Sequence, residues 1–178
     1  MNKDGEEYKF KFMLDYGCNC LWGFDEKTQN KYGYHIEDLT ELGLSKETIK
    51  LNDLVDELNC TYLNPIYQGF PSFWSGEMHK YFQSKVTELY ENIEKELGNL
   101  YEIILHESSK ELLEKEINTA EINNFIEDFI ANPIKYIPKG IYIKDEIIFK
   151  KEITEEYNKW KEKEKRILVK NSYWNISH

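Results

Sequence analysis

The sequence predicts an α+β fold, in which a small sheet of mainly antiparallel strands is packed by helices. Residues 8–14 alternate apolar and polar side chains, as a half-buried strand does. Residues 76–97 carry apolar side chains every three or four positions, which is the period of an amphipathic helix. Residues 100–106 follow at once as a strand rich in β-branched residues, so the helix is expected to pack on the sheet that this strand joins.

The N-terminal part of the chain is expected to supply two strands and two helices. Residues 15–17 form a turn after the first strand, and residues 18–24 form a second extended segment, so the two strands are expected to pair as a hairpin. Asp25 is a candidate N-cap for a short polar helix. Ser45 is a second candidate N-cap, and it precedes a predicted helix over residues 46–58 with an apolar stripe.

Residues 59–74 are irregular in composition, with the pair Asn64-Pro65, Gly69 and a second proline at Pro71. The segment is long for a loop inside a compact domain, so it is either functional or packed by its own aromatic side chains. Ser75 is expected to cap the long helix that follows.

The C-terminal third is predicted to contain helices and a hairpin. Two helices with apolar faces are expected before Asn132-Pro133 stops the second one. Residues 141–149 form two alternating pieces separated by three charged residues, which indicates a hairpin. A last helix over residues 154–166 is followed by an apolar triplet, residues 167–169, which we expect to be an edge strand.

A chain of 178 residues is long enough to form a domain with a core of its own. The sequence contains neither an internal repeat nor a low-complexity linker. We therefore predict an α+β core domain, residues 1–106, with a helical and hairpin extension, residues 107–178, packed on it as one compact unit.

The formal net charge is −10, and it is unevenly distributed. The segment from Lys150 to the end holds eight Lys/Arg and five Asp/Glu, or +3, which leaves −13 for residues 1–149. Such an acidic body repels the phosphates of nucleic acids and of membranes, and it favours a cationic partner. We expect no contact with nucleic acid or membrane.

The N-terminus is polar and acidic, and no apolar segment of the secretory type follows it. No stretch approaches the roughly 18 consecutive apolar residues that a membrane span needs. The three cysteines, Cys18, Cys20 and Cys60, are too few and odd in number for a secreted disulfide framework. These features predict a cytoplasmic location.

Cys18 and Cys20 are separated by one residue, a spacing that suits metal ligation or thiol chemistry if further ligands lie near. A structural zinc site usually needs four ligands, and beyond this pair the sequence offers only Cys60 and four scattered histidines. The nucleophile-elbow, P-loop and dinucleotide-binding motifs are absent. We therefore expect no enzyme activity and no cofactor. Two alternatives stay open: a small cysteine-dependent or metal-binding enzyme that uses Cys18 and Cys20, and a regulatory binding module.

Several short motifs follow one another in an order typical of one group of bacterial proteins. They are Cys20-Leu21-Trp22, Tyr32-Gly33-Tyr34, Leu42-Gly43-Leu44-Ser45, Leu63-Asn64-Pro65, Pro71-Ser72-Phe73-Trp74 and Glu96-Leu97-Gly98. Over residues 8–105 the chain resembles small cytoplasmic immunity-like proteins associated with polymorphic and contact-dependent growth inhibition toxins. Residues 65–67 depart from the pattern of that group, which tends to have a Trp there, and residues 107–178 have no counterpart in it.

The resemblance implies an immunity protein that binds and neutralises a cognate toxin, and it brings no catalytic residues with it. The acidic body suits a cationic toxin domain such as a nuclease. Exposed aromatic residues beside acidic ones are good anchors for a protein partner. The predicted contact residues are Trp22, Asp25, Glu26, Tyr34, Glu37, Asp38, Glu41 and Trp74.

Overall fold

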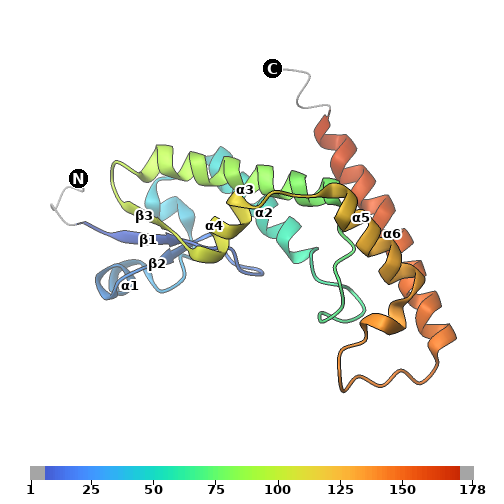
Figure 1. The fold of residues 1–178 in the computed structure, drawn as a ribbon. Helices are drawn as coiled ribbons and strands as arrows, with labels where there is room; N and C mark the ends of the chain where they lie inside the picture. Colours follow the sequence, from blue (N-terminus) through green and yellow to red (C-terminus); the bar gives the residue numbers. More distant parts are fainter. Residues whose placement is uncertain (1–6, 173–178) are drawn as a thin grey trace. The chain divides into compact units, whose positions relative to one another are not determined.

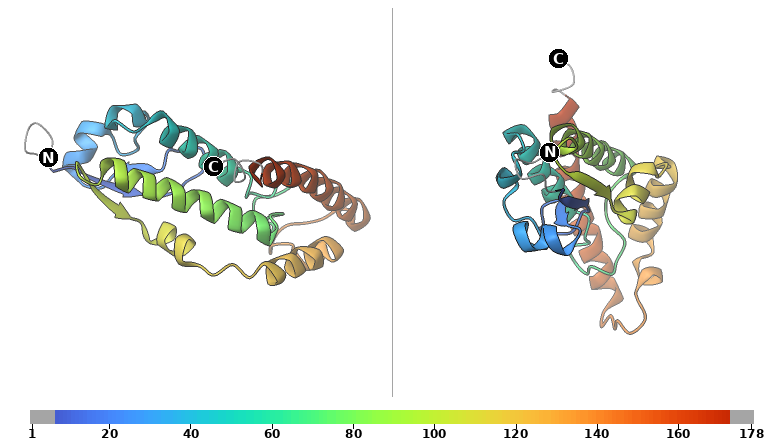
Figure 2. Two further views of the ribbon diagram at one scale, coloured as in Figure 1. Left: turned by 90° about the horizontal axis from the view of Figure 1, so that it is seen from above. Right: turned by 90° about the vertical axis from the view of Figure 1, so that its left-hand side faces the viewer.

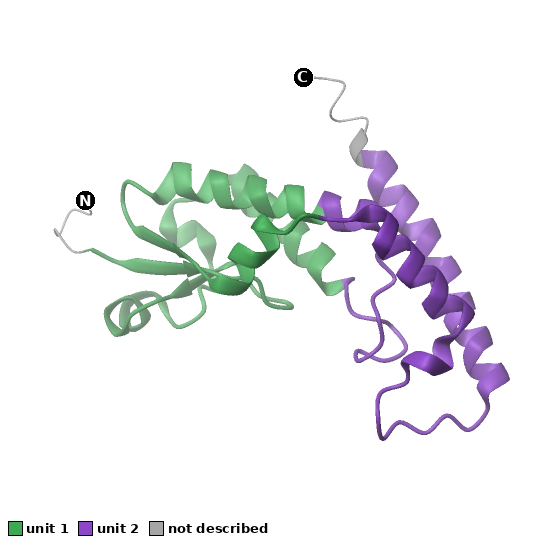
Figure 3. Ribbon diagram, viewed as in Figure 1, with its two compact units in different colours: residues 1–60, 82–116 green, residues 61–81, 117–178 purple. Residues whose placement is uncertain are grey.

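The computed structural model describes residues 7–172 of the chain. It contains two compact units (Figure 3), each made of two separate stretches of sequence. Unit 1 contains Met1–Cys60 and Phe82–Glu116, and unit 2 contains Thr61–Tyr81 and Ile117–His178. That residues 107–178 pack as an extension on a core of residues 1–106 stays a prediction.

Unit 1 contains a three-stranded mixed sheet (Figure 1). Its strands are β1 (Lys9–Phe12), β2 (Leu21–Gly23) and β3 (Glu102–Leu105), in the order β2-β1-β3. β1 and β2 pair antiparallel, with Phe10 opposite Gly23, which confirms the predicted hairpin. β1 and β3 pair parallel, with Phe10 opposite Ile103. The predicted α+β class is thus confirmed, with one parallel pair in the sheet.

Helices cover this sheet and complete unit 1. They are α1 (Glu26–Tyr32), the 3-10 helix η1 (Leu39–Leu42), α2 (Lys46–Cys60), α3 (Gly76–Leu97, from Phe82 onward) and α4 (Glu107–Glu114). Helices α2 and α3 lie side by side over one face of the sheet (Figure 2). The core forms between β1 and α3, where several side chains are completely buried: Phe10, Phe12, Val86, Leu89 and Ile93.

Unit 2 combines the start of α3 with α5 (Thr119–Ala131), the 3-10 helix η2 (Pro133–Tyr136) and α6 (Glu146–Ser172). Its core is aromatic. The ring centre of Phe70 lies 5.5 Å from that of Phe149, and the ring centre of Phe73 lies 5.6 Å from that of Tyr157. The irregular segment before α3 is therefore packed by its own aromatic side chains, which is one of the two outcomes expected for it.

The hairpin predicted over residues 141–149 is wrong, because helix α6 begins at Glu146. Asp145 supplies the start signal. Its carboxylate accepts hydrogen bonds from the N–H groups of Ile147 (2.9 Å) and Ile148 (3.0 Å), which a helix leaves unpaired in its first turn. The three charged residues between the two alternating pieces thus contain the cap of a helix.

The edge strand predicted at residues 167–169 is also wrong, because these residues continue α6. Phe149, Ile153 and Trp160 are buried and recur at helical spacing along α6. Burial of these three side chains in unit 2 therefore favours one long helix, and residues 167–169 lie near its C-terminal end.

Candidate partner-binding surface

The candidate surface is organised around β2 and the segment that follows α1. The N–H of Gly23 donates to the carbonyl of Tyr34 (2.9 Å) and the N–H of Ile36 to the carbonyl of Leu21 (3.2 Å), so this segment runs antiparallel beside β2. A Cβ atom on Gly23 would lie 2.6 Å from the carbonyl oxygen of Gly33. A glycine at this position in β2 therefore allows the chain to approach the strand closely after α1.

Two asparagines hold the segment in place. The side-chain amide of Asn19 donates to the carbonyls of Ile36 (2.9 Å) and Glu37 (2.8 Å). Asn52 of α2, which is buried, donates to the side-chain oxygen of Asn19 (2.7 Å) and accepts from the N–H of Cys20 (3.0 Å). Because buried polar groups with satisfied bonds fix the backbone around them, the place of Glu37 depends on Asn52. Neither asparagine was predicted, although a polar residue within the apolar stripe of α2 was a signal for such a role.

Two exposed aromatic rings lie beside β2. Tyr34 is 60% exposed, and Phe24, directly after the strand, is 49% exposed. Trp22 is 7% exposed, its Nε1 donates to the carbonyl of Met13 (2.9 Å), and its ring meets that of Tyr34 edge-on at 5.6 Å. Trp22 therefore supports Tyr34 from the core. Phe24 was not predicted as a contact residue, and its position next to Asp25 was the available signal.

Three of the predicted carboxylates, those of Glu26, Glu37 and Glu41, are exposed and form no ion pair within the described residues. Glu26 lies three residues after Gly23, the last residue of β2. Glu37 directly follows Ile36, which pairs with Leu21, the first residue of β2. Since a strand rises about 3.3 Å per residue, the first and last residues of the three-residue strand β2 lie roughly 7 Å apart. Side chains this close together fit within the area of about 800 Å² that each partner contributes to a standard protein interface.

The other two predicted carboxylates cap helices. Asp25 accepts from the N–H of Thr28 (2.8 Å) at the start of α1, and Asp38 accepts from the N–H of Thr40 (2.8 Å) at the start of η1. Hydrogen bonds from Thr28 lower the pKa of Asp25, and hydrogen bonds from Thr40 lower the pKa of Asp38. Both groups therefore carry their negative charge to lower pH than an ordinary aspartate.

Trp74, the remaining predicted contact residue, belongs to unit 2 and is 1% exposed. Its Nε1 donates to the hydroxyl of Thr61 (3.1 Å), and its ring meets that of Tyr62 edge-on at 5.2 Å. The rings of Trp74 and Tyr62 also meet that of His79 in α3 edge-on, at 5.5 and 5.8 Å, which holds the irregular segment against the start of α3. Because neither Trp74 nor Trp22 reaches the surface, the interface proposed below does not include them.

Neither Cys18 nor Cys20 has an activated thiol. Burial raises the pKa of the Cys20 thiol, and burial together with the Asp15 and Asp56 carboxylates raises the pKa of Cys18. The thiolate is the nucleophilic and metal-binding form, so these environments disfavour the chemistry of the alternative enzyme. Within residues 7–172, no three His, Cys, Asp or Glu side chains are grouped so that they could hold a metal ion.

Comparison with known families decides the relationship of the chain. Residues 8–108, more than half of the 178 residues, match the family described as Serratia CdiI immunity protein-like. The chain belongs to this family. The resemblance stated from the motifs is confirmed, an immunity role is supported, and such a role implies a cognate toxin as partner.

No curated protein matches the chain. None of the helices in the described part combines the length and the apolar character needed to cross a membrane.

In this CdiI-like protein, the motifs that carry the resemblance form structural contacts. Glu96 accepts from the N–H of Ser45 (2.7 Å) and from the hydroxyl of Thr48 (2.5 Å), which ties the end of α3 to the start of α2. In unit 2, the side-chain amide of Asn64 donates to the carbonyl of Pro71 (2.8 Å), which shapes the irregular segment. These motif residues stabilise the fold, so the binding residues of the family member are to be sought among the exposed side chains between them.

Proposed function

We propose that this protein neutralises its cognate toxin by binding the toxic domain through an acidic face of unit 1. The acidic face consists of Phe24, Asp25, Glu26, Tyr34, Glu37, Asp38 and Glu41. The observation that carries the proposal is Tyr34, which is 60% exposed and close in sequence to Glu37 and Glu41, two exposed carboxylates that form no ion pair within the described residues. A partner that buries such a ring gains binding free energy, since aromatic residues dominate the hot spots of protein interfaces.

The charge of the two units supports the choice of unit 1. Unit 1 contains 11 Lys/Arg and 22 Asp/Glu, a net charge of −11, whereas unit 2 contains 12 Lys/Arg and 11 Asp/Glu, a net charge of +1. The acidity of the chain therefore lies almost wholly in unit 1. An acidic surface accelerates the association of a cationic partner, and the effect weakens as salt shortens the range of the field.

A nuclease domain fits this charge best among toxic activities. Its active site must attract the phosphates of a nucleic acid, so its cleft carries positive charge. We infer that the toxin is a nuclease and that the acidic face covers its cleft. Neutralisation by covering the cleft needs no catalytic group in the immunity protein.

Co-expression tests the function. Cells that make this protein together with the toxic domain encoded by the neighbouring gene should grow, and the two proteins should elute as one complex from a sizing column. Arrested growth without a complex would contradict the proposed function, whatever surface is involved.

Substitutions test the acidic face. Tyr34→Ala removes the exposed ring and should weaken binding by roughly tenfold or more. Glu37→Lys combined with Glu41→Lys reverses two charges, and it should slow association by roughly tenfold at low salt and by less at high salt. Surface plasmon resonance measures both effects, because it separates association from dissociation.

Matched controls lie elsewhere on unit 1. Leu100→Ala truncates an apolar side chain that is 41% exposed, and Glu57→Lys combined with Glu91→Lys reverses two exposed charges on α2 and α3. These variants should bind the toxin as the wild-type protein does. If the variants of the acidic face also bind normally while the wild-type complex forms, the function holds and the interface lies elsewhere.

A further inference from the structure

One end of unit 2 is both cationic and apolar. Residues 133–151, which we call the basic end, hold five lysines and two acidic residues, a net charge of +3 in a chain of −10. Tyr142 is 86% exposed and Ile147 is 84% exposed, more than any other large apolar side chain in the described part of the chain, and Ile148 is 56% exposed. Water-exposed apolar groups of this size, gathered in one place, mark an interaction surface.

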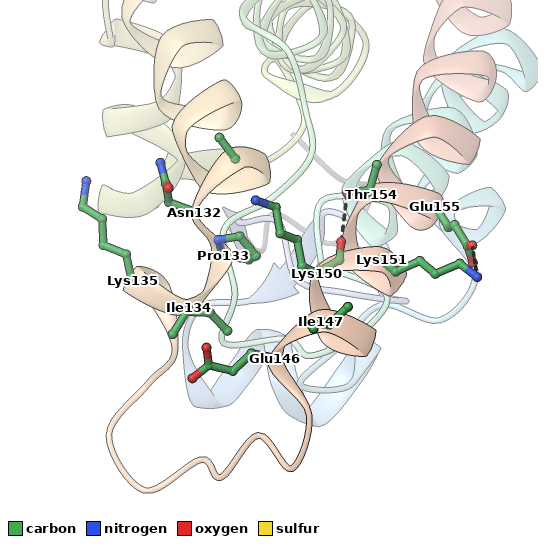
Figure 4. Close-up of a pocket in the computed structure, with 11 residues that line it drawn as sticks. Asn132, Pro133, Ile134, Lys135, Glu146, Ile147, Lys150, Lys151, Thr154 and Glu155 are labelled. Atoms are coloured by element: carbon green, nitrogen blue, oxygen red, sulfur yellow. Dashed lines mark hydrogen bonds and ion pairs between the residues drawn. The ribbon is translucent and has the colours of Figure 1, made fainter.

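The basic end is formed by η2, the loop of residues 137–145 and the first turns of α6 (Figure 1). An open pocket of about 890 Å³ lies between η2 and α6. Figure 4 shows Ile134 and Ile147 on two sides of this pocket, with the side chain of Lys150 extending between the two elements. Apolar side chains and an ammonium group thus share one surface.

The segment that forms the basic end contains more lysines than acidic residues, and most of its lysines are unpaired within the described part of the chain. Lys139, Lys144 and Lys150 form no ion pair within the described residues, and the other two lysines pair with carboxylates at 2.6 and 3.7 Å on exposed positions. Exposed pairs of this kind are weak and exchange readily. The carboxylate of Asp145 caps α6, which leaves Glu146 as the uncommitted acidic group of the segment.

We propose that the basic end binds an anionic lipid surface, with Tyr142 and Ile147 inserted at the level of the headgroups and the lysines on the lipid phosphates. If a second copy of this chain docked through the same face, two surfaces of net charge +3 would meet and repel each other. The cationic toxin domain proposed above would also meet charge of its own sign. The occupant must therefore be anionic and must accept apolar side chains.

The residue types favour a lipid surface over an acidic protein. Lysine stems cover apolar surface while their ammonium groups reach phosphates, and Tyr is enriched at the boundary between membrane and water. The acidity of the whole chain predicted no membrane contact, but almost all of that net charge belongs to unit 1.

Binding of this kind needs both components. A few inserted side chains or a few lysines alone give marginal attachment, and stable but reversible attachment takes an apolar and a basic signal together. The affinity for vesicles should therefore fall when either component is removed and when salt is raised.

Flotation of the full-length protein with lipid vesicles tests the proposal. Vesicles of equal parts phosphatidylglycerol and phosphatidylcholine should carry the protein at about 50 mM salt, and vesicles of phosphatidylcholine alone should not. Tyr142→Ser combined with Ile147→Ser should lower the partition coefficient by roughly tenfold. Lys139→Gln combined with Lys144→Gln should lower it by roughly fivefold. All four side chains are exposed, so the variants should keep the wild-type unfolding temperature.

Leu100→Ser and the pair Lys46→Gln with Lys50→Gln are matched controls at exposed positions of unit 1, and they should float as the wild-type protein does. Failure of the wild-type protein to float with anionic vesicles, or undiminished flotation of the Tyr142→Ser, Ile147→Ser variant, overturns the proposal. Loss of toxin binding in that variant without vesicle binding would assign the basic end to a protein, which overturns it too. Tyr34→Ala should weaken toxin binding and leave flotation unchanged, so the two proposals fail separately.

Discussion

Unit 1 and unit 2 each place a glutamate from one helix at the N-terminus of another. In unit 1, Glu96 of α3 accepts from the N–H and the hydroxyl of Ser45 (2.7 and 2.8 Å) and from the hydroxyl of Thr48 (2.5 Å) at the start of α2. In unit 2, Glu164 of α6 accepts from the N–H of Ser75 (2.9 Å) at the start of α3. Both carboxylates lie at the positive end of a helix dipole.

The two glutamates nevertheless differ in the direction of their pKa. Burial raises the pKa of Glu96, but the hydrogen bonds from Thr48 and Ser45 outweigh burial, so its pKa lies below the ordinary value. Glu164 is only 8% exposed, and burial raises its pKa despite the hydrogen bonds from Ser75. The number of donors relative to the degree of burial therefore decides whether a capping carboxylate favours its charged form.

Glu96→Ala should cause the largest loss of stability. The change leaves the donors of Ser45 and Thr48 without their acceptor, and hydrogen bonds to a charged group contribute about 1.5–3 kcal/mol. We expect the free energy of unfolding, measured with urea, to fall by about 2–3 kcal/mol. Glu91→Ala, exposed on the same helix, is the control and should change it by less than about 0.5 kcal/mol. Equal urea midpoints for the two variants would show that the Glu96 cap does not stabilise the protein.

Thr48→Val should lower the free energy of unfolding by less than Glu96→Ala does. It should also raise the pKa of Glu96, which is the direction in which the pKa of Glu164 is shifted. It removes one donor while keeping the shape of a side chain that is 1% exposed, so we expect a loss of about 1–2 kcal/mol. The pKa of Glu96, measured by carboxyl carbon NMR, should rise because a hydrogen bond to the charged form is lost. In the control variant Thr87→Val, the lost hydroxyl donated to the carbonyl of Gln83 (2.9 Å), and the pKa of Glu96 should stay unchanged. A constant pKa in Thr48→Val would mean that Ser45 alone sets it.

Local sequence patterns predicted most of unit 1. The alternation at residues 8–14 corresponds to β1, the helical period at residues 76–97 corresponds to α3, and Ser45 caps α2 as expected. No local pattern contains the contact between Ser45 and Glu96, which are 51 residues apart, or the parallel pairing of β3 with β1. These features depend on which helices and strands meet in the folded chain.

In unit 2 and at the acidic face, burial decides what the sequence leaves ambiguous. Residues 141–149 fit both a hairpin and the start of a helix, and the buried side chain of Phe149 selects the helix. The carboxylates of the acidic face were predicted because they lie near Tyr34 in the sequence. The exposure of each ring was not predictable in this way, because Trp22 and Trp74 become buried only when distant segments pack around them.

Glu164→Gln should have the smallest effect at neutral pH, within about 1 kcal/mol of the wild-type protein, because glutamine keeps an acceptor for the N–H of Ser75. The pH dependence of this variant is the sharper test. The raised pKa of Glu164 means that its contribution to stability is complete below the ordinary value of 4.5 and is lost as the pH rises through the pKa of the folded state. Glutamine does not ionise, so the variant should gain stability relative to the wild-type protein as the pH rises.

Glu96→Gln should show the opposite trend. The lowered pKa of Glu96 means that its contribution is present above the ordinary value of 4.5 and is lost as the pH falls through the pKa of the folded state. This variant should therefore lose stability relative to the wild-type protein as the pH rises. Urea denaturation of the wild-type protein and both variants between about pH 3 and pH 7 measures the two trends, that of Glu96 below pH 4.5 and that of Glu164 above it. The quantity compared is the difference in free energy of unfolding between each variant and the wild-type protein, as a function of pH. Opposite trends for the two variants would support the assigned causes of the two pKa shifts, whereas the same trend for both would contradict them.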